Sequence, residues 1–138
     1  MYWVNDYINK PWRAYARGTD AYDCWGLVIH VLGHHFNTFT HQHSSVITDD
    51  SEGITTAFYE ELSSGQWKAI DTPEHGSVVV CWQSGKVRHV GVYLAIDGGL
   101  ILHSKENKGV TTDRLPAFQQ VFSKVQFYVK DSAHYRAA

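Results

Sequence analysis

The stretch Tyr22-Asp23-Cys24-Trp25-Gly26-Leu27-Val28 decides how we expect this chain to fold. Asp23 is a residue type that caps helices, and the apolar residues after it recur at helical spacing up to Val31 and Leu32. The pattern predicts a helix that starts at the cysteine and ends near Gly33. In the first turn of a helix, unpaired N–H groups and the helix dipole favour a thiolate and supply donors for an oxyanion. Cys24 is therefore a candidate nucleophile, although a buried structural thiol explains this stretch equally simply.

A histidine and a glycine mark a second segment, Arg88-His89-Val90-Gly91-Val92-Tyr93-Leu94. Its alternation predicts a half-buried strand over residues 89–96 that His89 opens. Gly91 would let another backbone approach closely. His89 at the mouth of a strand is a candidate general base for a cysteine at a helix start, whereas in isolation it would be a surface residue.

A third segment, Leu100-Ile101-Leu102-His103-Ser104, supplies a candidate for the group that orients the base. Asp97-Gly98-Gly99 predicts a hairpin between the second and third segments. A tight turn there would pair His103 with Val92, about 10 Å from His89 along the strand and on the other face of the sheet. Contact between the histidines would need a wider connection or a glycine bulge that sets them nearly opposite each other.

Helical patterns occupy the first half of the chain and strand patterns the second. Besides the helix at Cys24, we expect a short helix over residues 2–8 and another over residues 51–62, the latter with a capping box formed by Asp49 and Glu52. Further strands are expected over residues 77–82 and 125–129. The prediction is an α+β domain spanning residues 1–138, with N-terminal helices packed on an antiparallel sheet.

Taken together, the three segments resemble the NlpC family of bacterial cell-wall peptidases. That family has Asp-Cys-x-Gly-aliphatic at a helix start, His-Val-Gly-aliphatic-Tyr on a strand, and a polar residue, commonly His, on the next strand. The resemblance covers roughly residues 11–115 and implies a papain-like fold. It also implies that Cys24, His89 and His103 are catalytic: the Cys24 thiolate, paired with protonated His89, would attack an amide carbonyl while His103 holds the imidazole.

The resemblance also implies substrate-binding residues. Trp12-Arg13-Ala14-Tyr15 is similar to the aromatic segment that lines the family's substrate groove, although Trp12 stands where the family often has Tyr. The residues implied for substrate binding are Trp12, Tyr15, Asp23 and Trp25. Ser77 is a second departure, because the family more usually has Asp there. The implied substrate is the γ-D-glutamyl–diaminopimelate bond of peptidoglycan stem peptides.

Composition and the N-terminal sequence limit the binding partners and the cellular location that we expect for this protein. The formal net charge of −2 gives no reason to expect nucleic acid as a partner, and no apolar stretch is long enough for membrane insertion. The N-terminus has no features of a signal peptide, so we expect synthesis in the cytoplasm. The chain looks most like phage tail-associated members of the family, which implies phage tail proteins as partners and action in the periplasm.

Several alternatives stay open at this point. A tail-tip structural or assembly protein, an exported antibacterial effector, and an acyl hydrolase or transamidase would all be consistent with the same residues. We expect no cofactor and no metal: the histidines that could suggest zinc form no metal-binding signature and lie partly in a polar loop, these being His30, His34, His35, His41, His43 and His75. Cys81, amid valines, is expected to be an apolar strand residue.

Overall fold

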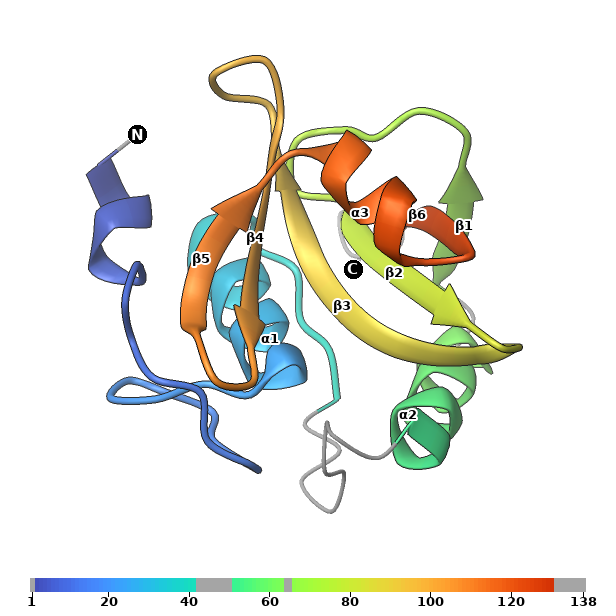
Figure 1. Cartoon of the computed structure of the whole chain (residues 1–138), viewed down its shortest axis with the longest axis horizontal. Coiled ribbons are helices and arrows are strands. Elements are labelled where there is room, and N and C mark those ends of the chain that lie inside the picture. The colour runs from blue at the N-terminus through green and yellow to red at the C-terminus, as the bar shows by residue number, and fades with distance from the viewer. Residues whose placement is uncertain (1, 42–50, 64–65, 131–138) are drawn as a thin grey trace, which may run out of the picture.

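The computed structural model describes residues 2–41, 51–63 and 66–130 (Figure 1). A short 3-10 helix, η1 (Tyr2–Asp6), precedes the two long helices α1 (Cys24–His35) and α2 (Ser51–Ser63). The strands and the third helix follow in the order β1 (Trp67–Ile70), β2 (Val78–Gln83), β3 (Lys86–Leu94), β4 (Leu100–Lys105), β5 (Gly109–Asp113), α3 (Leu115–Val121) and β6 (Lys124–Lys130). None of the described helices is long and apolar enough to span a bilayer.

The strands form one antiparallel sheet in the order β1-β6-β2-β3-β4-β5. Strands β2 to β5 follow one another as hairpins, whereas β6 returns to lie between β1 and β2. The predicted α+β class, with N-terminal helices on an antiparallel sheet, is confirmed.

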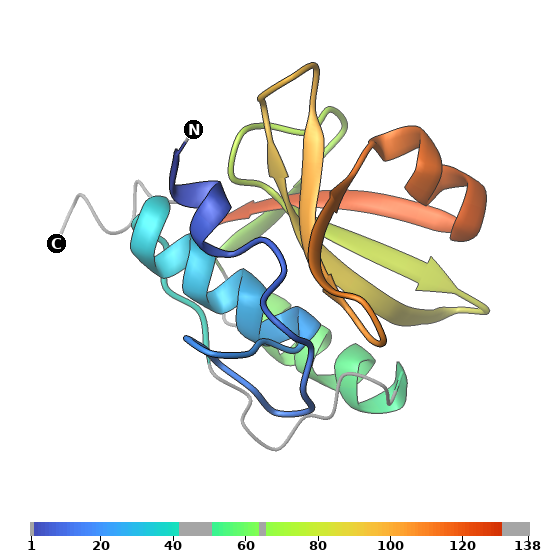
Figure 2. The ribbon, with the colours of Figure 1, turned by 60° about the vertical axis from the view of Figure 1, so that its left-hand side comes forward.

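The two faces of the sheet carry different layers. Helices α1 and α2 pack against one face, where α1 contacts β3 and β4 and α2 contacts β3 (Figure 2). Buried residues of both helices and of the sheet form the larger core there, including Leu27, Val31, Val90 and Leu102. Helix α3 covers the other face, where Phe118 packs with Val79, Cys81, Ile101 and Phe127. The separation follows from strand alternation, which sends neighbouring residues to opposite faces.

Some boundaries differ from the sequence-based expectation. Strand β3 begins at Lys86, so His89 lies inside the strand and does not open it. The expected capping residue Asp49 lies outside the described residues. Strands β1 and β5 and helix α3 were not expected. Helix α3 has only seven residues, too few for a clear helical period, and β5 (Gly-Val-Thr-Thr-Asp) has only one large apolar residue.

Candidate active site

Asp23 shapes the start of α1. Its fully buried carboxylate accepts hydrogen bonds from the backbone N–H of Gly26 (2.7 Å) and of Tyr15 (3.0 Å). It also accepts bonds of 2.8 Å to each oxygen from Arg17 Nη1. Burial raises the pKa of Asp23, while the Arg17 charge and the N–H donors oppose that rise. The predicted helix cap is confirmed, and the same carboxylate ties the preceding loop to the helix.

Gly26 allows that loop to approach closely. A Cβ on Gly26 would lie 2.1 Å from the carbonyl oxygen of Ala16, which itself accepts a hydrogen bond from the Asp23 N–H. Cys24 is the first residue of α1 and is 1% exposed. The N–H groups of Gly26 and Leu27 bond to Asp23, so they are not available to an oxyanion.

The two predicted histidines meet at the sheet. His89 Nε2 on β3 lies 2.8 Å from His103 Nδ1 on β4. His103 Nε2 in turn lies 2.7 Å from Asp113 Oδ2 at the end of β5. The structure thus places three titratable side chains in an unbroken hydrogen-bonded line across three strands.

The register explains this contact and corrects our expectation. Strand β3 pairs with β4 so that Val92 lies opposite Leu102, one residue away from the tight-turn register. The same register sets Gly91 opposite His103, which makes His89 the diagonal neighbour on the same face. We expected that contact would need the two histidines nearly opposite each other. They are instead diagonal neighbours and still make contact. A Cβ on Gly91 would lie 3.2 Å from His103 Cβ, so the glycine makes room for the contact.

Asp113 is a site residue that sequence reasoning missed. On β5 it lies opposite Ile101, which makes it the diagonal neighbour of His103. The run Val110-Thr111-Thr112 has the β-branched composition of a strand, and Asn107 and Gly109 before it are turn residues. These signals indicate a turn followed by a strand, but they do not show that Asp113 faces His103.

Both histidines are held in their neutral form. Burial, with smaller contributions from His103 and Lys105, lowers the pKa of His89 to about 3. Burial also lowers the pKa of His103, although the Asp113 carboxylate opposes this effect. At neutral pH the resting His89 is uncharged. The ion pair between a thiolate and protonated His89, which we expected from the family resemblance, would need a proton that this environment disfavours.

Helix α3 covers the histidine pair with aromatic rings. Phe118 meets His103 edge to face, with ring centroids 4.8 Å apart and an interplanar angle of 85°. Phe122 lies nearly parallel to His89, at 12° and a centroid distance of 6.2 Å. These apolar neighbours account for the desolvation that keeps the imidazoles neutral.

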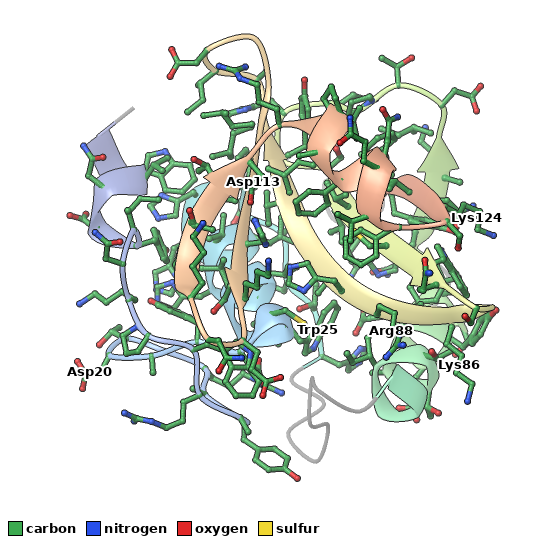
Figure 3. The ribbon with its side chains drawn as sticks, in the orientation of Figure 1. Asp20, Trp25, Lys86, Arg88, Asp113 and Lys124 are labelled. Carbon is green, nitrogen blue, oxygen red and sulfur yellow. The ribbon has the colours of Figure 1, made fainter. Side chains whose placement is uncertain are left out.

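Cys24, His89 and His103 line one cavity of about 560 Å³. Trp12 lines the same cavity. Its wall carries charges of both signs, from Arg88 and Lys105 and from Glu106 and Asp113. In Figure 3 the label Trp25 marks the start of α1, and Asp113 lies where β5 leads into α3. The cavity therefore brings together a thiol from a helix start, an imidazole base and an aromatic side chain, the groups needed for nucleophilic attack on a bound carbonyl.

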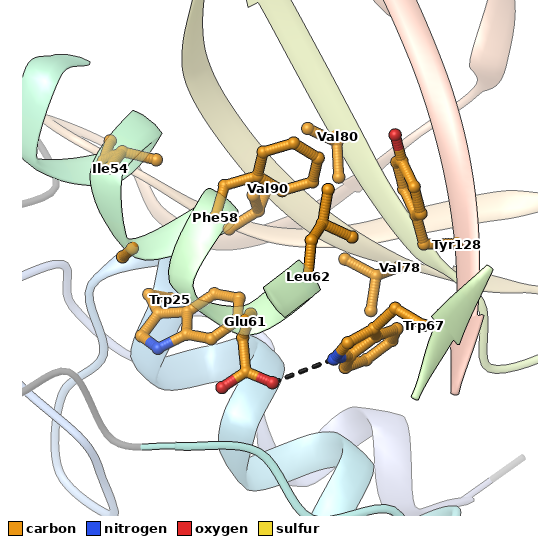
Figure 4. Close-up of a pocket in the computed structure, with 11 residues that line it drawn as sticks. Trp25, Ile54, Phe58, Glu61, Leu62, Trp67, Val78, Val80, Val90 and Tyr128 are labelled. Carbon is orange, nitrogen blue, oxygen red and sulfur yellow. Dashed lines mark hydrogen bonds between the residues drawn. The ribbon is translucent and has the colours of Figure 1, made fainter. Parts of the chain in front are cut away.

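The other three residues predicted to bind substrate do not line this cavity. Tyr15 is 46% exposed, and the Asp23 carboxylate faces Arg17. Trp25 lines a separate apolar cavity of about 30 Å³ beneath α2, beside the buried Glu61, whose Oε2 accepts a bond from Trp67 Nε1 (2.8 Å) (Figure 4). Their roles in substrate binding stay predictions.

The histidines considered for metal binding serve other contacts where the structure describes them. Tyr7 Oη lies 2.7 Å from His30 Nδ1 and 3.0 Å from His35 Nε2. His35 stacks on Trp3, and His41 Nδ1 lies 2.7 Å from Glu61. His43 lies outside the described residues. Within the described ranges, no group of three or more His, Cys, Asp or Glu side chains is arranged to hold a metal ion.

Comparison with known proteins identifies the fold and the family. A solved structure, the NlpC/p60 domain of the peptidoglycan hydrolase SagA, superposes with a TM-score of 0.60 at 19% sequence identity, covering 92% of this chain and 92% of that chain. This similarity confirms the predicted papain-like NlpC fold. A search of curated proteins found no match. The sequence profile of the NlpC/P60 family matches residues 9–130. The chain belongs to the NlpC/P60 family.

Proposed function

We propose that this protein is a cysteine endopeptidase that hydrolyses peptidoglycan stem peptides, with Cys24 as nucleophile and His89 as general base. The observation that carries the proposal is the cavity that Cys24, His89 and His103 line together. Family membership supports the reaction class, and the NlpC/p60 domain of the peptidoglycan hydrolase SagA has a similar fold. The finer assignment, cleavage between γ-D-glutamate and diaminopimelate, rests on the family resemblance. Arg88 and Lys105 are the cationic residues of the cavity wall that would pair with the carboxylates of such a peptide, although the acidic Glu106 and Asp113 line the same wall.

The reaction begins with neutral partners. His89 takes the thiol proton as Cys24 Sγ forms a bond to the amide carbonyl carbon. The His89 imidazolium then gives this proton to the leaving amine as the C–N bond breaks. Water attacks the carbonyl carbon of the resulting thioester while His89 accepts a proton from the water. The C–S bond then breaks, and the His89 imidazolium returns that proton to the leaving sulfur, which restores the thiol. Through both half-reactions His103 holds the imidazole in place.

Digestion of purified muropeptides tests the proposal. The unsubstituted protein should release fragments that carry a free diaminopimelate amine, detected by mass spectrometry, and Cys24→Ala should release none. Cys81→Ala is the matched control, because it removes the other buried thiol and leaves the proposed nucleophile. Equal products from all three proteins, or none from any, would refute the peptidase assignment. Cleavage at another amide would keep the enzyme class and correct the bond.

The proposed nucleophile can also be tested without a substrate. Burial raises the pKa of Cys81, with a smaller contribution from Cys24, so Cys81 should resist alkylation in the folded protein. Iodoacetamide at neutral pH should label Cys24 first, and His89→Ala should slow that labelling by about 100-fold or more. Preferential labelling of Cys81 would contradict the environment assigned to Cys24.

We further propose, from the family resemblance alone, that the protein is carried by a phage tail and digests the wall from the periplasmic side. Immunogold labelling of purified virions would test this. Labelled tails together with an inactive protein in the muropeptide assay would favour the structural role instead.

A further inference from the structure

We infer that Asp113 is a positioning residue for the base: acting through His103, it determines which ring nitrogen of His89 is free to accept a proton. The inference rests on the proposed function and extends it to a residue outside the matched motifs. It is carried by the two contacts of His103, which lies 2.8 Å from His89 on one side and 2.7 Å from Asp113 on the other.

The direction of each hydrogen bond follows from what each group can donate. A carboxylate only accepts, so the proton between Asp113 Oδ2 and His103 Nε2 belongs to His103. A neutral imidazole carries one proton, which leaves His103 Nδ1 as an acceptor. The proton between the two histidines then belongs to His89 Nε2. His89 Nδ1 is consequently unprotonated, and it is the nitrogen left to take the proton of Cys24.

The opposite arrangement of protons fails at the carboxylate. If His103 donated from Nδ1 to His89, His103 Nε2 would be a bare lone pair facing a carboxylate oxygen at 2.7 Å. His89 would then carry its proton on Nδ1 and could not act as a base toward the thiol. Asp113 thus disfavours the inactive tautomer of His89, although it does not contact that residue.

The surroundings keep the chain of bonds in this state. His103 is 3% exposed, whereas the Asp113 side chain is 40% exposed, so the relay runs from a buried imidazole to a carboxylate that water can reach. The charged and titratable groups that act on the pair are His89 on β3, Lys105 and Lys108 at the end of β4 and in the following turn, and Asp113 on β5. Phe118 of α3 and Phe122, the C-cap of that helix, face these imidazoles with apolar rings.

The tautomers are measurable directly by long-range ¹H–¹⁵N correlation spectra of the full chain near neutral pH. In the unsubstituted protein, both His89 and His103 should be protonated at Nε2 and bare at Nδ1. In Asp113→Ala, His103 should shift toward the Nδ1–H form, and His89 should follow. A purely structural role for Asp113 would leave the tautomers of a folded variant unchanged.

Alkylation of Cys24 supplies the kinetic readout. Asp113→Ala should slow labelling by iodoacetamide on the order of 10-fold, less than removal of the base itself. Asp97→Asn is the matched control, since it removes a carboxylate from the exposed turn between β3 and β4 and tolerates the positive φ of 50° there. The control should retain both the tautomers and the labelling rate of the unsubstituted protein.

The outcomes separate this inference from the proposed function. Protonation of His103 at Nδ1 in the unsubstituted protein would overturn the inference, even if Asp113→Ala failed to fold. Unchanged tautomers and labelling in a folded Asp113→Ala would overturn it too. Neither measurement uses peptidoglycan, so a failed muropeptide digestion would refute the peptidase assignment and leave a confirmed relay intact.

Discussion

At the scale of single residues, the site depends on where side chains are missing as much as on where they are present. Gly91 faces β4 at the position where His89 and His103 make contact. A Cβ there would lie 2.9 Å from Ile101 Cγ2 and 3.0 Å from the Leu102 carbonyl oxygen. Backbone cannot move aside as a flexible side chain does, so the strands would have to separate.

Gly91→Ala is therefore expected to destabilise the protein by about 1–3 kcal/mol, the usual cost of overpacking a close contact. It should also slow Cys24 alkylation, because it separates His103 from His89. Gly33→Ala is the matched control: it lies in α1 with no atom within 4 Å of the added Cβ, so it should stabilise by about 0.5–1 kcal/mol. Chemical denaturation measures both changes, and a Gly91→Ala variant as stable as the unsubstituted protein would contradict the register.

At the scale of elements, the helix that presents the proposed nucleophile is anchored by the loop that precedes it. The loop before α1 is held by a buried ion pair, in which Asp23 is fully buried and the Arg17 side chain is 18% exposed. A carboxylate taken out of water in this way depends on its partner, because a lone buried charge is strongly destabilising.

Arg17→Met should accordingly lower the free energy of unfolding by about 3–5 kcal/mol. Adding Asp23→Asn should restore part of that loss, because no unpaired charge is then buried. Arg13→Met, an exposed arginine of the same loop, should change stability by no more than about 0.5 kcal/mol. Urea titrations of these proteins and of the Asp23→Asn single variant measure these differences, and additive losses in the double variant would argue against a coupled pair.

The elements also show which parts of the molecule a sequence can predict. The helix at Cys24 and the strands at His89 and His103 carry strong local signals: a cap, helical spacing and alternation. What local patterns could not predict was the pairing register, because it depends on a connection of five residues, 95–99, whose sequence also suits a tighter turn. The contact of Asp113 with His103 could not be predicted for the same reason, because it depends on the pairing of β5 with β4.

At the scale of the whole molecule, four histidines share one electrostatic property. Burial lowers the pKa of each of them below the ordinary value of 6.5, these being His30, His35, His89 and His103. In the unfolded chain the same groups take up protons at their ordinary pKa. The unfolded state therefore binds more protons than the folded state below about pH 6.5.

Stability should consequently fall as the pH is lowered from 7 toward 4, and for His89 the loss continues down to its folded pKa of about 3. The raised pKa of Asp23 acts in the opposite direction, but it is a single group. Thermal melting followed by circular dichroism across this range would measure the fall, and His89→Gln should make it shallower. A melting temperature that is constant or rises on acidification would contradict the neutral histidine pair.

The hydrogen-bonded line from His89 through His103 to Asp113 crosses two hairpins. Its last member, Asp113, ends β5, the fifth of the six strands in the chain. During translation Cys24 is synthesised early and Asp113 late. Under the proposed function and the relay inferred above, Cys24 would gain its oriented base only after β5 has paired with β4, so an incomplete chain would carry a comparatively inert sulfur.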